Sequence, residues 1–103
     1  MILHLAAFVW KDDVTTDDVA ALTAALREMA DGIPELKFYE CGESLRLRPN
    51  GADYGVAAVV ENEGGLSAYL DSAAHVAVYE NLLGRMVASR LAVQLPVDGG
   101  TVW

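Results

Sequence analysis

Three side chains of this sequence have the chemistry of a proton-transfer site: His75, Tyr69 and His4. The apolar spacing around His75 predicts a helix that begins just before it. A histidine in the first turn of a helix lies at the positive end of the helix dipole, which lowers its pKa. A neutral imidazole can take a proton from a carbon next to carbonyl groups, and a nearby tyrosine can hydrogen-bond the enolate oxygen. We therefore take His75, Tyr69 and His4 as candidate catalytic residues.

The same residues also have purely structural interpretations. His75 can donate a hydrogen bond to a buried carbonyl, and His4 can be a core histidine whose hydrogen bonds are satisfied. Tyr69 and Tyr54 can pack as amphipathic side chains with the hydroxyl at the edge of the core. The two histidines and Asp71 lack the spacing of metal ligands, and no phosphate-binding loop occurs, so we predict neither a metal site nor a cofactor.

The elements that must position these residues follow from the apolar pattern. Strands are predicted at 2–10, 36–41, 54–60 and 90–95, and a polar loop at 42–53. Thr15 can cap a first helix that ends at Gly32. Residues 62–65 are predicted to break the chain before a short helical turn at 66–70. Ser72 can cap the second helix, whose apolar stripe is predicted at His75, Tyr79, Leu82 and Met86.

This order of elements predicts an α+β fold of the ferredoxin-like βαββαβ type, an antiparallel sheet with two helices on one face. The other face would then expose more apolar surface than a monomer usually tolerates. A second copy, packed sheet to sheet about a two-fold axis, is the simplest cover. We therefore predict a homodimer whose interface includes Leu3, Leu5, Ala7, Val9, Ala57, Val59, Leu91, Val93 and Leu95.

Composition narrows the possible partners and locations. The 103 residues suit one domain, predicted at 1–96 with a C-terminal tail at 97–103. The net charge of −8 argues against nucleic acids and anionic membranes, which both require a basic surface. The apolar start of the chain lacks a basic segment and is too short to span a bilayer, so we expect a cytoplasmic protein. The single cysteine, Cys41, is predicted to be a buried thiol.

Several short motifs together resemble the stress-responsive dimeric α/β-barrel (Dabb) domains. They are His4 with the segment from Phe8 to Lys11, Ile33-Pro34, Gly42, Asp53-Tyr54-Gly55, and Tyr69 with Ala74-His75. The resemblance extends over about residues 2–96 and implies a ferredoxin-like monomer that pairs into a dimeric barrel. Many members of this family have no known biochemical role. One plant member is a cyclase that closes a polyketide chain by aldol condensation without a cofactor.

The resemblance to that cyclase also implies a site between the sheet and the helices. Its tyrosine–histidine pair matches Tyr69 and His75, and its first-strand histidine matches His4. Two of its polar residues are missing here, because Val56 and Leu26 stand near the positions of a second histidine and a helical tyrosine. Phe8 and Tyr54 are further candidate ligand-binding residues with Val56 and Leu26, although Phe8 and Leu26 also suit a plain core.

Three functions therefore remain open from the sequence. The first is a homodimer of stress-response type that binds a small apolar molecule between sheet and helices. The second is a cofactor-independent cyclase or isomerase that uses His75, Tyr69 and His4. The third is a structural protein with a filled core. An open pocket at these residues would favour the first two functions over the third.

Overall fold

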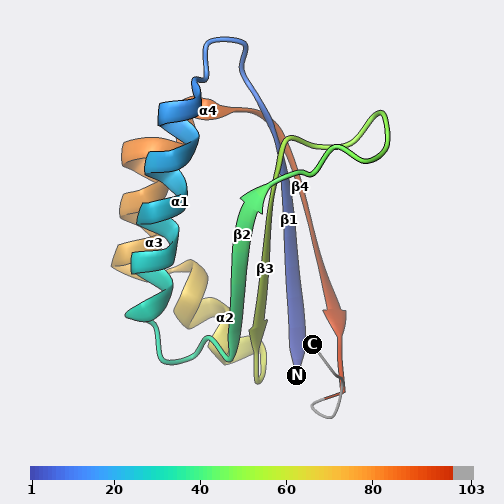
Figure 1. Ribbon diagram of the computed structural model, residues 1–103. Helices are drawn as coiled ribbons and strands as arrows, with labels where there is room; N and C mark the ends of the chain where they lie inside the picture. Colours follow the sequence, from blue (N-terminus) through green and yellow to red (C-terminus); the bar gives the residue numbers. More distant parts are fainter. Residues whose placement is uncertain (99–103) are drawn as a thin grey trace.

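The computed structural model describes residues 1–98, in which one sheet carries all of its helices on a single face (Figure 1). Most of the predicted C-terminal tail, residues 99–103, lies outside the described residues. A hairpin loop after β2 extends from the opposite side of the sheet, away from the helices (Figure 1). Within residues 1–98, no helix is both long and apolar enough to cross a membrane.

The elements follow the predicted order. The strands are β1 (Ile2–Trp10), β2 (Phe38–Glu43), β3 (Tyr54–Val60) and β4 (Val87–Pro96). The first helix is α1 (Thr16–Asp31). The second helical region consists of α2 (Glu63–Leu70), α3 (Ala73–Val78), a π-helical turn η1 (Tyr79–Leu83) and α4 (Gly84–Met86).

The four strands form an antiparallel sheet in the order β2-β3-β1-β4. His4 on β1 lies opposite Ala58 of β3 and Gln94 of β4, so these three residues share one face of the sheet. The helices cover this face (Figure 1). The predicted ferredoxin-like architecture is confirmed.

Helix α1 begins and ends where its sequence signals predict. The Thr15 hydroxyl accepts a hydrogen bond from the Asp18 backbone, and the Asp18 carboxylate accepts one from the Thr15 backbone. These reciprocal bonds satisfy backbone donors that the first turn leaves free. The helix ends at Gly32 and buries one stripe against the sheet, formed by Val19, Leu22, Leu26 and Met29.

The second helical region differs from the prediction in two ways. Residues 62–65 do not break the chain, because the Asn62 side chain accepts a hydrogen bond from Gly65 and caps α2. The expected stripe through Tyr79 is also wrong, since Tyr79 is 45% exposed while Leu83 is buried. The π-helical turn shifts the buried face, and Gly84 permits it, because a Cβ there would lie 3.0 Å from the Tyr79 carbonyl oxygen.

Two strand boundaries also differ. Strand β2 begins at Phe38 and continues through Gly42 and Glu43, which were expected in the loop. Strand β4 begins at Val87 rather than Arg90, because its pairing with β1 extends to Trp10 across an irregularity next to Val9. The backbone pairing therefore continues through residues whose side chains show no apolar alternation.

The sheet face opposite the helices is largely uncovered. Leu91, Val93, Leu95 and Val9 are exposed, and Leu91 reaches 81%. A wide hollow of about 830 Å³ crosses this outer face, with Leu5, Ala57 and Val93 in its lining. Val59 departs from the prediction, because it is buried rather than exposed. An exposed apolar surface of this kind is typical of a protein–protein interface, because monomeric proteins rarely expose a large contiguous apolar patch.

Candidate functional site

A second, more enclosed cavity of about 230 Å³ lies between the sheet and the helices. It brings together six of the seven candidate residues, which come from β1, β3, α1, α2 and α3. These six are His4, Phe8, Leu26, Val56, Tyr69 and His75. The outer hollow is larger, but it lies on the uncovered face and lacks both histidines. The inner cavity is therefore the better candidate for chemistry.

Tyr69 is the central side chain of this cavity and is only 2% exposed. Its ring meets the His75 ring edge to face, with centroids 5.1 Å apart, and the His4 ring at 6.2 Å. Burial raises the pKa of Tyr69 to about 12. The hydroxyl therefore stays protonated at neutral pH and can act as a hydrogen-bond donor.

A hydrogen bond of the His75 backbone fixes this residue in the first turn of α3. Ser72 caps this helix as predicted, because its hydroxyl accepts a hydrogen bond of 3.1 Å from the His75 backbone. The pKa of His75 is lowered mainly by burial, while the Leu70 backbone and the Asp71 charge act in the opposite direction. The predicted direction is the same, but loss of solvent is the main cause.

His4 is the only buried polar or charged residue within residues 1–98. Its Nδ1 lies 2.9 Å from the amide nitrogen of Gln94. An amide nitrogen can only donate, so Nδ1 accepts and the proton of the neutral ring lies on Nε2. Burial lowers the pKa of His4, followed by the charges of His75 and Arg90. Both histidines of the cavity are thus neutral near pH 7.

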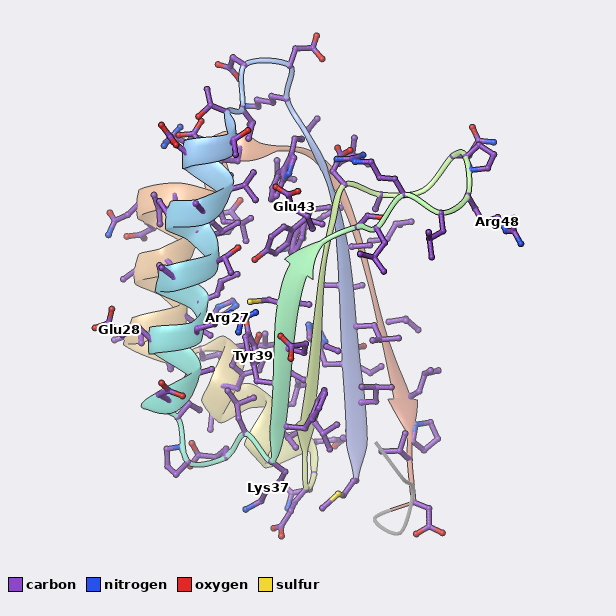
Figure 2. All side chains as sticks on the ribbon, in the orientation of Figure 1. Arg27, Glu28, Lys37, Tyr39, Glu43 and Arg48 are labelled. Atoms are coloured by element: carbon purple, nitrogen blue, oxygen red, sulfur yellow. The ribbon has the colours of Figure 1, made fainter. Side chains whose placement is uncertain are left out.

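Tyr39 is a site residue that the sequence analysis missed. It projects from β2 into the space beside α1 (Figure 2) and packs edge to face on Tyr69, with centroids 6.1 Å apart. Its hydroxyl is buried close to that of Tyr69; burial strongly raises the pKa of Tyr39, and the neighbouring Tyr69 hydroxyl acts in the same direction. Tyr39 and Cys41 are two positions apart on β2 and therefore point to the same face of the sheet. Because Cys41 was predicted to be buried, this spacing could have identified Tyr39 from the sequence.

Tyr54 is the candidate residue that lies elsewhere. It is almost fully buried among Phe8 and Trp10, with centroids 6.5 and 5.4 Å away. Its hydroxyl lies 2.7 Å from that of Thr23 on α1. The side chain therefore ties β3 to the first helix, while Phe8 alone of this cluster lines the cavity.

Arg90 and Tyr79 also line the cavity and were not expected there. Both are exposed, so they lie where the cavity opens to solvent. Arg90 is opposite Phe8 on the sheet and its charge lowers the pKa of both histidines. The sequence analysis placed Arg90 in the last strand but did not connect it with the cavity, and the π-helical turn changed the orientation of Tyr79.

Together these groups form an apolar cavity with neutral bases and protonated hydroxyls at one end. Such an arrangement can bind a small molecule through a carbonyl or hydroxyl group, and it can move a proton between that molecule and an imidazole. No group of three or more side chains suited to hold a metal ion occurs within residues 1–98.

The lowered pKa values of His4 and His75 predict how stability depends on pH. Both groups titrate near 6.5 in the unfolded chain and lower in the folded protein. Below pH 6.5 the unfolded state binds more protons, so the free energy of unfolding falls as pH decreases. The slope has an upper limit of about 1.4 kcal/mol per pH unit for each histidine, and stability should level off by about pH 7.5, one unit above the pKa of the unfolded chain.

Urea unfolding between pH 5 and pH 7.5 measures this effect. The variant with both His4→Gln and His75→Gln should lose the slope. Asp18 and Asp53 do not interfere, because backbone hydrogen bonds from Thr15 and Trp10 hold their pKa below 3.8. They cost stability only at lower pH. A level free energy across the whole range would contradict the assigned burial of the histidines.

Comparison with known proteins places this chain in a family. The family model described as Stress Responsive A/B Barrel Domain (Dabb) matches residues 2–97. The chain belongs to this family. An uncharacterised Streptomyces coelicolor protein is 34% identical over 79 residues, which are 75% of this chain and 81% of that protein.

Solved structures agree with this family assignment. A Thermobifida fusca protein, described as dimeric, ferredoxin-like and of unknown function, is 38% identical with a TM-score of 0.87. The match includes 93% of this chain and 90% of that one. Hydroxynitrile lyase from Passiflora edulis shares the fold, with a TM-score of 0.80 at 10% identity over 98% of this chain and 96% of that one.

Proposed function

We propose that this Dabb protein is a homodimer that binds a small, largely apolar molecule in the cavity between sheet and helices. The observation that carries this proposal is the 230 Å³ cavity bordered by the candidate residues. A purely structural protein would fill this space with side chains. Two observations support the dimer: the uncovered outer face of the sheet and the dimeric Thermobifida fusca relative. The cytoplasm stays its predicted location.

The cavity volume limits the size of the ligand. A water molecule occupies about 30 Å³ in the liquid, so 230 Å³ corresponds to roughly eight waters. Sites for drug-sized ligands usually exceed about 300 Å³. A compact molecule of roughly eight to ten non-hydrogen atoms therefore fits, which is the size of a single substituted aromatic ring or a short aliphatic chain.

The lining determines how such a ligand would lie. Phe8, Leu26 and Val56 provide apolar contacts along its body. The polar groups of the cavity are the hydroxyls of Tyr39 and Tyr69 and the two imidazoles. A ligand oxygen can accept a hydrogen bond from a phenol or from an imidazole N–H. The expected ligand thus carries an oxygen-containing group at one end of an apolar body.

Histidine ring signals in NMR spectra provide the test. A panel of small aromatic and aliphatic carbonyl compounds and acids should shift the signals of His4 and His75 together and displace their titration. His75→Gln removes one reporter and should leave the His4 response in place if the ligand fills the cavity. A panel that moves neither histidine would contradict the proposal.

A second candidate function is acid–base catalysis on the bound molecule without a cofactor, of cyclase or isomerase type. The edge-to-face contact of His75 and Tyr69 favours it, because a neutral imidazole beside a protonated phenol can act as base and donor. The shared fold of a hydroxynitrile lyase is compatible with this chemistry. Any turnover found with a bound panel member should fall at least 100-fold in His75→Ala while binding persists.

A further inference from the structure

The cavity that we propose as the binding site has one charged side chain in its lining, and that charge is positive. Its described lining contains Arg90 but no aspartate or glutamate. The whole protein, in contrast, has 15 acidic residues against seven basic ones. The outer hollow shows the same contrast, because Glu40 and Glu43 lie in its lining. The inner cavity is thus an exception to the acidic character of the molecule.

Arg90 is also free to take a partner. Three of the other four arginines form ion pairs, which join Arg27 to Glu40, Arg46 to Asp53 and Arg85 to Asp18; among the described residues, Arg48 on the hairpin has no acidic partner. Within residues 1–98, no acidic side chain pairs with Arg90. Its guanidinium can therefore receive the two oxygens of a carboxylate in a fork geometry, without giving up an existing contact.

The position of Arg90 sets the orientation of such a ligand. Arg90 lies on the edge strand β4 at the open end of the cavity, whereas Tyr39 lies on the opposite edge strand β2. These edges are three strand spacings apart, about 14 Å between backbones, and both side chains line the cavity. Phe8, Leu26 and Val56 line the space between them. A ligand with its anionic group at Arg90 would point its apolar body towards Tyr39.

From this arrangement we infer that the ligand is a small monocarboxylic acid, bound as its carboxylate by Arg90 with its apolar body inside the cavity. The inference rests on the proposed function and names the chemical class of its ligand. Arg90 determines specificity, and the aromatic ring of Tyr79 flanks the same opening. The neutral histidines leave Arg90 as the main positive charge that the carboxylate meets.

Matched pairs of probes test the inference by calorimetry and NMR at pH 8, where both histidines are neutral. Benzoate is compared with benzamide and hexanoate with hexanamide. The two members of each pair have nearly the same shape, but only the carboxylate carries a charge. The carboxylates should bind at least about fivefold more tightly, and high salt should reduce this difference. Arg90→Gln should abolish the preference while amide binding persists, and Arg90→Lys should restore part of it.

Arg48→Gln is the matched control, because Arg48 is equally charged and lies on the hairpin far from the helices (Figure 2). It should leave every affinity unchanged. If acids and amides bind equally well, or Arg90→Gln leaves the preference intact, the carboxylate inference is wrong while the binding function stands. If no member of either pair binds the wild-type protein, both the inference and the proposed binding function are wrong.

Discussion

Replacing Leu5 with aspartate is expected to convert the protein from a dimer to a folded monomer. Leu5 lies at the centre of β1, between Ala57 of β3 and Val93 of β4. All three line the hollow on the uncovered sheet face. In a two-fold dimer each copy would bring one carboxylate into the same dry interface, and burying an unpaired charge costs several kcal/mol. The dissociation constant should rise at least 100-fold, which corresponds to about 2.7 kcal/mol.

Light scattering after size-exclusion chromatography measures the molar mass directly, and circular dichroism checks that the monomer is folded. Val9→Asp on the same face is expected to act in the same direction. Ala24→Asp is the matched control, because Ala24 is exposed on α1, which packs on the other face of the sheet. A folded Leu5→Asp variant that keeps the mass of a dimer would show that another surface joins the two copies.

Replacing Leu22 with alanine is expected to lower the free energy of unfolding by about 3–5 kcal/mol. Leu22 is fully buried between α1 and the sheet, so truncation leaves a cavity that its neighbours cannot fill. A domain of this size has only about 5–15 kcal/mol in total. The melting temperature should therefore fall by roughly 15 °C or more.

Leu26→Ala, one turn further along α1, provides the comparison. Leu26 is also buried, but it already borders the 230 Å³ cavity and so has fewer atoms packed against it. We expect a smaller loss, about 2–3 kcal/mol, together with binding of larger ligands. Urea unfolding at one fixed protein concentration measures both variants, since dimerisation contributes to apparent stability. An equal or larger loss in Leu26→Ala would mean that the cavity is filled by neighbouring side chains.

The order of elements and the helix starts were predictable because their causes are local. Thr15 and Ser72 cap helices through hydrogen bonds to residues three positions away. The stripe from Val19 to Met29 and the apolar pattern of β1 required only the periods of helix and strand. Placing His4, Tyr69 and His75 in one cavity relied on the resemblance to the Dabb domains as well as on strand parity.

The errors had causes that no local pattern records. The π-helical turn at 79–83 moved Tyr79 away from the predicted stripe, and it depends on the close approach of Gly84 to the Tyr79 carbonyl. Tyr54 was expected at the ligand, but its hydroxyl meets Thr23 across the core. Strand β4 began earlier than predicted because β1 supplied the pairing partners for Val87 and Ser89.

The sequence alone thus determined the fold class and the apolar face that a second copy would cover, because apolar periodicity is encoded residue by residue. Its short motifs indicated the family by resemblance. Only the tertiary structure decided which side chains share the cavity. It brought Tyr39 and Arg90 to opposite edges of the same pocket from strands far apart in the chain. It also buried the Tyr39 hydroxyl beside that of Tyr69. Burial and charge in the cavity depend on packing across the sheet, which a linear pattern does not contain.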